Sequence, residues 1–468
     1  MISDDRTART LVVDDPFTGE AVCSVALAGD VTVNSTLDAA QSAARAWRQS
    51  PIAERIALCE RAMDAMEKRA SSIGDDITRM MGKPIAQSLG EVKTTAVRAR
   101  YLIGIADQAL AEVVKPPMTG FDRRVLREPL GVIFNLPAWN YPLLTAVNCV
   151  FPAVLAGNAV IVKHSPRTPL CADHFARAFA DAGAPANLVQ ALTCDHTTSE
   201  KIVGDSRIDH VVFTGSVHGG HRIMLSASKR FLHPCLELGG NDPAYVAPDC
   251  DLAKTVENIV DGAIYNAGQS CCAVERVYVH ASIYGRFLQE AEALVRAYVM
   301  GDPRSDTTTL GPIAQPHHPA ELEALVREAS NAGARLITGG AAARVDGRGR
   351  FFEATLIAEC QQSMRLFRQE SFGPIVPVMP VESDEDALAR MNDSQLGLTA
   401  SVWTSDRQRA ERLARGLQYG TVFMNRCDYL DPALPWSGWK ESGRGVSLST
   451  LGFDALTRPK ALHFRLGF

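Results

Sequence analysis

Short apolar segments alternate with helical patterns along most of the 468-residue chain, and this alternation restricts the possible folds more than any other feature. Compact apolar runs bounded by Gly, Pro or Asn occur at residues 132–134, 159–162, 211–213 and 244–246. Long helical patterns, such as residues 170–182, lie between them. Runs of this length and composition are typical of fully buried strands. The alternation therefore predicts parallel sheets with helices on both faces.

A second series of the same kind follows residue 240. Its predicted strands are residues 276–279, 335–337, 375–378, 400–403 and 421–423, and its predicted helices are 283–299, 319–332 and 384–391. The chain begins instead with helical patterns at 39–47, 52–69 and 91–112. A chain this long exceeds one compact core, so about two or three domains are expected. We predict an α/β protein with two Rossmann-like, doubly wound domains that meet near residues 239–240.

Composition narrows the classes of partner. Hydrophobic residues make up 46% and charged residues 22%, as in ordinary globular proteins. The net charge of −5 gives no electrostatic case for nucleic acid or an anionic membrane. No run approaches the roughly 18 apolar residues of a membrane-spanning helix, and residues 1–7 are polar, without a signal core. The 11 cysteines contain no CxxC pair, which indicates a reducing compartment and no structural zinc. We expect a cytoplasmic protein without a metal.

Two adjacent thiols carry the first chemical signal. Cys271 and Cys272 lie in a small polar turn, and the carboxylate of Glu237 lies 34 residues before Cys271. A thiolate is a strong nucleophile, and a carboxylate can move protons for it. This pattern favours an enzyme that forms a covalent bond to sulfur. Taken alone, the two cysteines could equally be buried apolar thiols.

Further polar motifs follow the predicted strands. Residues 215–220 join a strand to a helix, as phosphate-binding turns do, although many such turns are only tight connections. Lys163 ends another strand, where doubly wound sheets bind nucleotides, or it is a solvated strand end. Asn140 offers an amide donor for an oxyanion hole, or it caps the next helix. Residues 369–374 and the glycine-rich loop 435–445 could each shape a pocket or simply connect elements.

As an ordered set, these motifs resemble those of the aldehyde dehydrogenase superfamily over nearly the whole chain, from about residue 18. The matching segments are residues 139–142, 163, 213–220, 237–240, 268–271, 370–374 and 435–445. The resemblance implies NAD(P)-dependent, non-acylating oxidation of an aldehyde to its carboxylic acid. It also implies that Cys271 is the nucleophile, that Asn140 and the Cys271 backbone N–H hold the oxyanion, and that Glu237 activates water. Cys272 matches a variable position, and we assign it no catalytic role.

The resemblance extends to the cofactor and substrate sites. It implies that Lys163 binds the adenosine ribose, that Ser216 and Trp139 contact the pyrophosphate beside Gly215 and Gly220, and that Glu370 binds the nicotinamide ribose next to Phe372. The residues that fall where the family builds its substrate tunnel are Tyr141, Leu144, Leu430 and Trp436.

The domain organisation follows in the same way. The resemblance implies a cofactor-binding domain of residues 1–111 and 130–239, a catalytic domain of residues 240–441, and a small β oligomerisation element. That element joins a hairpin at residues 112–129 to a return segment and strand at residues 442–468, and the family's usual assembly is a homodimer or homotetramer. The alternating tail, residues 461–466, either pairs within the chain or adds to another subunit's sheet.

Three positions depart from the family pattern. Pro166 stands where many NAD-preferring members carry a glutamate, and Arg167 follows it, so NADP use is consistent with the sequence unless Arg167 faces solvent. We leave the preference between NAD and NADP open, with a slight lean to NAD. Ser447 replaces a carboxylate linked to proton exit, so Glu237 is expected to act with water alone. Asn148 replaces a large aromatic and predicts a roomier or more polar pocket.

Three other functions fit the sequence less well. A CoA-acylating dehydrogenase generally lacks the general base, and an inactive relative loses the nucleophile or the base, whereas both residues are present here. A thioesterase use of the thiol would leave the nucleotide site superfluous. For the substrate, Asp428 and Asp431 around Tyr429 suit a cationic aldehyde, unless both acids face solvent or hydrogen-bond locally. Aldehydes that carry a carboxylate are less favoured but stay open, because Arg426 is the sole arginine in the recognisable substrate segments.

Overall fold

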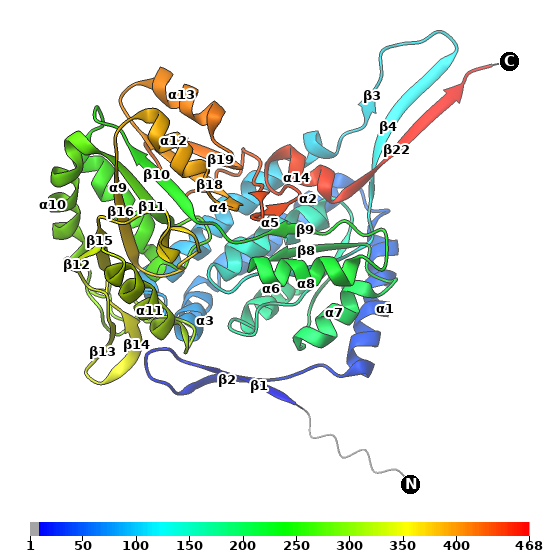
Figure 1. Cartoon of the computed structure of the whole chain (residues 1–468). Coiled ribbons are helices and arrows are strands. Elements are labelled where there is room, and N and C mark those ends of the chain that lie inside the picture. Colours follow the sequence, from blue (N-terminus) through cyan, green and yellow to red (C-terminus); the bar gives the residue numbers. More distant parts are fainter. Residues whose placement is uncertain (1–8, 468) are drawn as a thin grey trace.

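The computed structural model describes residues 9–467, and the polar residues 1–7 considered above lie outside this range (Figure 1). Two lobes are each built around one sheet. The six-stranded sheet of the first lobe runs in the order β21 (Gly443–Arg444), β9 (Cys235–Glu237), β8 (His210–Thr214), β5 (Val132–Leu136), β6 (Ala159–Val162) and β7 (Val189–Ala191). The seven-stranded sheet of the second lobe runs in the order β12 (Arg335–Thr338), β15 (Thr355–Ala358), β16 (Ile375–Val381), β11 (Val274–His280), β10 (Asp242–Val246), β18 (Thr399–Trp403) and β19 (Thr421–Met424).

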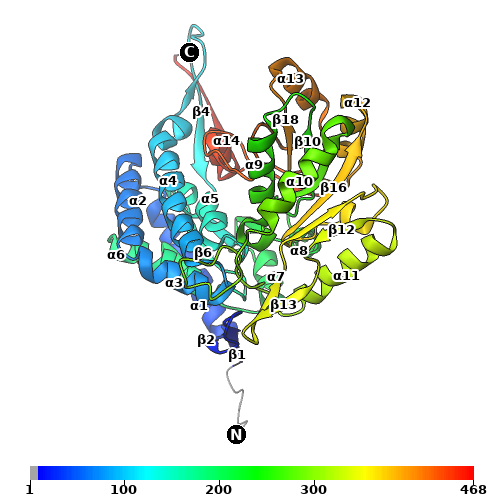
Figure 2. The same cartoon turned by 90° about the vertical axis from the view of Figure 1, so that its left-hand side faces the viewer.

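Helices flank both sheets, as the two views in Figures 1 and 2 show. Those of the first lobe are α1 (Asp30–Trp47), α2 (Ile52–Glu67), α3 (Ala70–Met81), α4 (Ile85–Leu110), α5 (Pro142–Leu155), α6 (Leu170–Asp181), α7 (His196–Gly204), α8 (Val217–Ala227) and α14 (Ser449–Ala455). Those of the second lobe are α9 (Leu252–Ile264), α10 (Tyr284–Val295), α11 (His318–Asn331), α12 (Asp384–Asn392) and α13 (Arg407–Gly416). Parallel pairing predominates, with β12 and β21 antiparallel at the edges. The predicted α/β fold class is confirmed.

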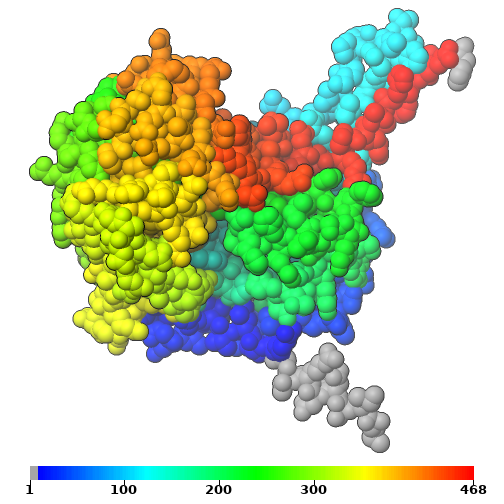
Figure 3. All heavy atoms as spheres, in the orientation of Figure 1, coloured from blue at the N-terminus to red at the C-terminus, as the bar shows by residue number. Residues whose placement is uncertain are grey.

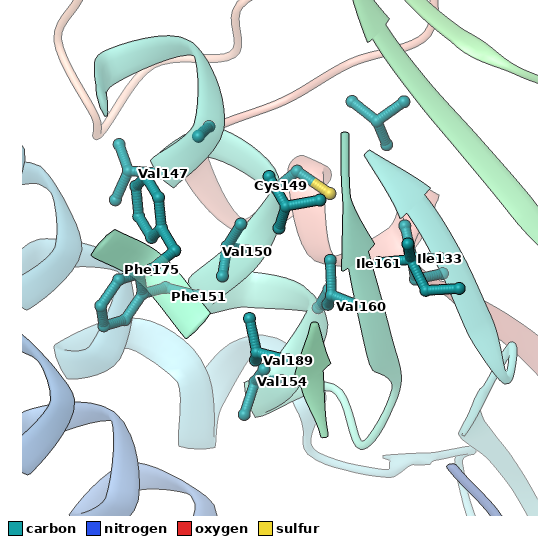
Figure 4. Packing of buried hydrophobic residues seen from close by; sticks show 14 of the residues in the cluster. Ile133, Val147, Cys149, Val150, Phe151, Val154, Val160, Ile161, Phe175 and Val189 are labelled. Carbon is teal, nitrogen blue, oxygen red and sulfur yellow. The ribbon is translucent and has the colours of Figure 1, made fainter. Parts of the chain in front are cut away.

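Helix α5 shows how the core of the first lobe positions the site. It is apolar on nearly all sides and therefore packs between the sheet and neighbouring helices. Val147, Val150, Phe151 and Val154 lie among side chains of β5, β6, β7 and α6 (Figure 4). Pro142 starts the helix at no cost, because the N–H that proline lacks would have no helical partner there. The turn before α5 carries residues 139–141, so this packing holds them at the end of β5.

A long β arm projects from the first lobe (Figures 1 and 2). The C-terminal strand β22 (Thr457–Arg465) pairs antiparallel with β4 (Phe121–Pro129) over nine residues, and β3 (Val113–Val114) adds to the other edge of β4. Of the two alternatives for the tail, pairing within the chain is the one found. Its part in subunit assembly stays a prediction.

An N-terminal hairpin that the sequence did not reveal joins the two lobes. Strands β1 (Thr10–Asp14) and β2 (Ala21–Ala26) run along the base of the molecule, beneath both lobes (Figures 1 and 3). The Asp14 carboxylate accepts hydrogen bonds from Arg167 of the first lobe and Arg350 of the second. These ion pairs lower the pKa of Asp14 to about 2, against the opposing effect of burial. The hairpin therefore ties the lobes together electrostatically.

Residues 9–467 lack two kinds of feature. No helix among them is long and apolar enough to cross a membrane. No group of three or more His, Cys, Asp or Glu side chains in the same range is arranged to hold a metal ion.

Candidate active site

One cavity of about 650 Å³ lies between the lobes and receives side chains from both. Its wall contains nine of the predicted site residues: Cys271, Glu237, Asn140, Lys163, Gly215, Ser216, Trp139, Glu370 and Phe372. The structure does not place Gly220, Tyr141, Leu144, Leu430 or Trp436 in this wall. Segments separated by more than 200 residues in the sequence therefore converge on one space.

The turn before Cys271 is held in an unusual backbone conformation. Asn266 and Ala267, in η1 (Tyr265–Gly268), have φ angles of 54° and 55°, in the left-handed region that side chains rarely adopt. Gly268 follows at φ +68°, and a Cβ there would lie 2.1 Å from the Gly373 carbonyl oxygen. The Gln269 side chain braces the turn by donating to Asn266 O (3.0 Å) and accepting from Ala314 N (2.9 Å). The turn is thus locked against the second lobe.

The two adjacent thiols lie in different environments. Cys271 is half-buried and lines the cavity, whereas Cys272 is buried and donates to Asp428 Oδ1 at 3.0 Å. The pKa of Cys272 is raised well above its usual range, first by its hydrogen bond with Cys271 and then by burial and by Asp428. Cys272 therefore stays a protonated thiol at neutral pH, and Cys271 is the sulfur that faces the cavity.

Asp428 is engaged locally. Its Oδ1 accepts from Ser270 Oγ (2.9 Å) and from the Cys272 thiol, and burial raises its pKa to about 6. Asp431 accepts from the backbone of its own turn, at Ala433 N (2.9 Å). Both acids thus make local hydrogen bonds. This was the alternative to the expectation that they bind a cationic aldehyde. Nearby, the Arg426 guanidinium stacks on the Tyr429 ring at 3.4 Å from the centroid.

Asn140 is fixed beside the nucleophile turn. Its side-chain Nδ2 donates to Gln269 O (3.1 Å), two residues before Cys271, and its backbone oxygen accepts from Asn266 Nδ2 (3.1 Å). A carboxamide carries two N–H hydrogens, so one remains for a further acceptor. Asn140 can therefore donate to an oxygen atom that develops charge next to Cys271.

Glu237 ends strand β9 within a polar cage. Thr214 Oγ1 donates to it at 3.0 Å, and the Ser447 hydroxyl donates to its other oxygen. Burial raises the pKa of Glu237, while hydrogen bonds from Ser447 and Thr214, the charge of Arg98 and a hydrogen bond with Asn148 oppose that rise. Ser447, where the family often places a carboxylate, supplies a direct donor to Glu237, and the expectation that Glu237 acts with water alone stays a prediction.

The first-lobe side of the cavity offers groups that suit a dinucleotide. Ser216 caps α8, its Oγ accepting from Gly219 N at 3.1 Å, so the positive end of the helix dipole faces the cavity. Lys163 is buried, and its ammonium group has no hydrogen-bond partner within the described part of the chain. Gly220 lies outside the cavity wall. A Cβ there would meet the Leu238 side chain at 2.7 Å, so glycine at this position lets α8 pack closely on the segment after β9.

The second-lobe side contributes Glu370 and Phe372. The Glu370 carboxylate accepts one hydrogen bond from residues 9–467, from Gly240 N at 3.1 Å. Burial, followed by the nearby charge of Glu275, raises the pKa of Glu370 well above its usual range. The Phe372 ring packs edge-on against Trp139, with centroids 5.5 Å apart. A carboxylate with unused acceptor sites suits ribose hydroxyls, and the unpartnered Lys163 suits them too, so these residues fit a bound dinucleotide.

Arg167 does not serve the ribose end of the cavity. It is largely buried against Asp14, as described for the N-terminal hairpin, and it does not line the cavity. Pro166 does line it, and so does Glu200, whose carboxylate is paired with Arg222 at 2.8 Å. The cation that the sequence suggested for a 2′-phosphate is thus already taken.

Sequence reasoning missed Thr214 and Arg98 as partners of Glu237. Thr214 lies inside the matched strand–turn motif and offered no separate signal. Arg98 did carry one: it falls on the buried face of α4, between Thr95 and Leu102, where the helical spacing calls for small or apolar residues. A charge on a buried helical stripe indicates a polar partner in the interior.

Comparisons with known proteins agree with this geometry. The sequence model of the aldehyde dehydrogenase family matches residues 2–462. A probable succinate-semialdehyde dehydrogenase (NADP⁺) of Synechocystis sp. is 34% identical, covering 96% of this chain and 98% of its own, and a succinate semialdehyde dehydrogenase (NAD(P)⁺) of Escherichia coli is 34% identical, covering 94% of each. The structure of Staphylococcus aureus betaine aldehyde dehydrogenase in complex with NAD⁺ superposes with a TM-score of 0.94 at 27% identity, covering 100% of this chain and 93% of that one. The chain therefore belongs to the aldehyde dehydrogenase family, and its activity is the NAD(P)-dependent oxidation of an aldehyde.

Proposed function

We propose that Cys271, Asn140 and Glu237 carry out this oxidation. The observation that supports the assignment is their convergence on one cavity from three distant segments, beside groups that suit a dinucleotide. The Cys271 thiolate attacks the aldehyde carbon, and the carbonyl oxygen takes up the negative charge. The free N–H of the Asn140 carboxamide and the Cys271 backbone N–H donate to that oxygen. Sulfur and the former carbonyl carbon are then joined as a thiohemiacetal.

The second half of the reaction belongs to Glu237. When bound, the nicotinamide supplies the acceptor for the hydride that leaves the thiohemiacetal carbon. The thioester that remains on Cys271 is hydrolysed by water, whose proton Glu237 takes. The hydroxide adds to the thioester carbon, the Cys271 thiolate leaves, and the carboxylic acid is released. Thr214 and Ser447 hold the Glu237 carboxylate for this step.

For the cofactor, we infer that the protein accepts both NAD⁺ and NADP⁺, and that Lys163, Ser216 and Glu370 hold it. No carboxylate stands at Pro166 to repel a 2′-phosphate, and the Glu200 charge is balanced by Arg222. Relatives named for NADP⁺ and for NAD(P)⁺ support this inference more than a preference for NAD alone.

For the substrate, we infer an aldehyde that carries a carboxylate rather than a cation. Asp428 and Asp431 make local hydrogen bonds, and neither lines the cavity where a cationic aldehyde would bind. Relatives named for succinate semialdehyde support the same direction. The domain boundaries at residues 111, 129, 239 and 441, and assembly through the β4–β22 arm into a homodimer or homotetramer, are part of this proposal.

The test compares the two thiols. Cys271→Ala removes the attacking sulfur and should lower kcat by a factor on the order of 10⁴ or more, with dinucleotide binding retained. Cys272→Ala is the matched control and should keep turnover within about threefold, because a protonated thiol beside Asp428 takes no part in the reaction. Reduced-cofactor absorbance is followed with aliphatic, carboxylated and cationic aldehydes, each with NAD⁺ and NADP⁺.

Three outcomes would contradict these assignments. Equal loss in both cysteine variants would remove the distinction between the thiols. A highest kcat/KM for betaine aldehyde would reverse the substrate inference. Turnover that requires added CoA would favour the acylating reaction instead.

A further inference from the structure

A buried arginine lies behind Glu237 without a carboxylate in contact. Arg98 of α4 is 4% exposed. Its Nη1 donates to Asn148 Oδ1 (2.9 Å) and to Leu144 O (3.2 Å), both on α5. Its Nε has no hydrogen-bond partner, and among residues 9–467 the side chain forms no ion pair. A buried guanidinium is costly unless another charge compensates it, so its position requires an explanation.

The surroundings of Arg98 identify the compensating charge. Burial lowers its pKa, and the groups that oppose this are, in decreasing order, Glu237, Cys272, Glu91 and Tyr429. Glu91 is already balanced, because its carboxylate holds the Lys83 ammonium and accepts from Leu143 N (2.8 Å). Cys272 is a protonated thiol. Glu237 is therefore the acid whose charge Arg98 balances.

Asn148 connects the two residues. Arginine can only donate hydrogen bonds, so Asn148 must turn its carbonyl oxygen toward Arg98. Its amide hydrogens then face the other way, and Asn148 is among the groups that lower the pKa of Glu237 against the effect of burial. An N–H donor stabilises a carboxylate, whereas a protonated acid would need an acceptor. The direction of the Asn148 amide thus depends on Arg98, and the charge state of Glu237 depends on that direction.

The other groups around Glu237 do not supply this charge. Thr214 and Ser447 are neutral donors. The thiols of Cys149 and Cys235 lie near the carboxylate, and burial raises the pKa of each well above neutral, in Cys235 to about 12. Of the groups that lower the pKa of Glu237, Arg98 is therefore the cation.

We propose that Arg98 is a positioning residue that acts through Asn148 to keep Glu237 ionised for deacylation. This inference rests on the proposed role of Glu237 as the general base. It assigns a purpose to Asn148, which the sequence had suggested only as a sign of a roomier or more polar pocket.

The experiment measures hydrolysis of the acyl-enzyme directly, without cofactor. p-Nitrophenyl acetate acylates Cys271, and the decay of the acetylated protein is followed by intact mass spectrometry as a function of pH. In Arg98→Met, the pH at which decay reaches half its plateau should rise by about one unit or more, because a nearby opposite charge is lost. Arg98→Lys, which restores a cationic donor, should return most of that shift, and the rate of acylation should stay the same.

Two further variants keep the test decisive. Asn148→Leu interrupts the connection from the other side and should shift the profile in the same direction, so it decides the matter if Arg98→Met does not fold. Arg100→Met is the matched control, because Arg100 lies on the same helix but is only half-buried and is paired with Glu60, Asp64 and Glu67. It should leave the profile in place.

The outcomes distinguish a failure of the proposed role of Glu237 from a failure of the inference about Arg98. If Glu237→Gln deacylates like the wild type, the proposed base is wrong. If Glu237→Gln stalls as an acyl-enzyme while Arg98→Met and Asn148→Leu keep the wild-type profile, the inference about Arg98 alone is overturned. A rise in KM for a carboxylated aldehyde without a change in the pH profile would also overturn it, and would assign Arg98 to substrate binding.

Discussion

The two sides of the cavity each present a carboxylate, and the two are supported very differently. Glu237, on the first-lobe side, receives hydroxyl donors from Thr214 and Ser447 and lies near the charge of Arg98. Glu370, on the second-lobe side, receives only the Gly240 N–H from the described residues. Burial raises the pKa of both. A carboxylate whose acceptor sites are filled by protein donors is held in place for chemistry. A carboxylate with unfilled acceptor sites can instead accept hydrogen bonds from a ligand.

Replacing the well-supported carboxylate should have the largest effect. Glu237→Gln keeps the size and several hydrogen bonds but cannot accept a proton, so steady turnover should fall by about two to four orders of magnitude. One equivalent of reduced cofactor per active site should still form in a rapid-mixing experiment, because hydride transfer precedes the step that needs the base. Loss of that burst together with steady turnover would mean that Glu237 is also needed for hydride transfer or for cofactor binding.

Replacing Glu370, the carboxylate with a single protein donor, should weaken dinucleotide binding and leave the chemical steps unchanged. Glu370→Gln removes the charge from an acceptor for ribose hydroxyls, a loss of about 1.5–3 kcal/mol, or about 10- to 100-fold in the Kd for the dinucleotide. Calorimetric titration with NAD⁺ measures this directly. Cofactor-free deacylation should be unchanged, and Glu237→Gln, with normal dinucleotide binding, is the matched control. A deacylation defect in Glu370→Gln would contradict the assignment of Glu370 to binding and of Glu237 to deacylation.

Removing one hydrogen-bond donor to Glu237 should have the smallest effect of the three changes. Ser447→Ala deletes a hydroxyl that favours the charged form of Glu237, so the folded-state pKa of Glu237 should rise further. Below that pKa the base is protonated and inactive; the acid limb of kcat should therefore move to higher pH, with a loss of about fivefold on that limb. Ser449→Ala is the matched control, because Ser449 is equally buried at 6% but caps Leu451 N rather than contacting Glu237. An unmoved acid limb would show that the Ser447 hydroxyl does not support the charge.

Local patterns were enough to predict most of the fold. The strand at residues 159–162 has the predicted bounds, and the helix predicted from residue 170 ends at Asp181, one residue early. Buried parallel strands are apolar along their whole length, which separates them clearly from the amphipathic helices between them. The β1–β2 hairpin was missed because its short strands are half exposed, and only Val13 is buried in β1.

The site was predictable where it follows a motif and not where it depends on distant contacts. The nine predicted residues in the cavity wall all lie in segments quoted from the sequence. The support proposed for Glu237 from Arg98 involves a residue 139 positions away, and no local spacing could show that Arg98 donates to Asn148. Ser447 was read as the loss of a carboxylate, whereas the structure shows the gain of a hydroxyl donor.

The left-handed turn before Cys271 has a consequence for the order of events during protein synthesis. Two of its anchors lie far apart in the chain: the Asn140 amide is made 129 residues before Gln269, and Gly373, whose carbonyl lies against Gly268, is made about 100 residues after it. Until the ribosome has released that later segment, the turn lacks the contact that makes its conformation stable. An unfinished polypeptide therefore carries ordinary cysteines, and an aligned nucleophile arises only after both lobes have closed on each other.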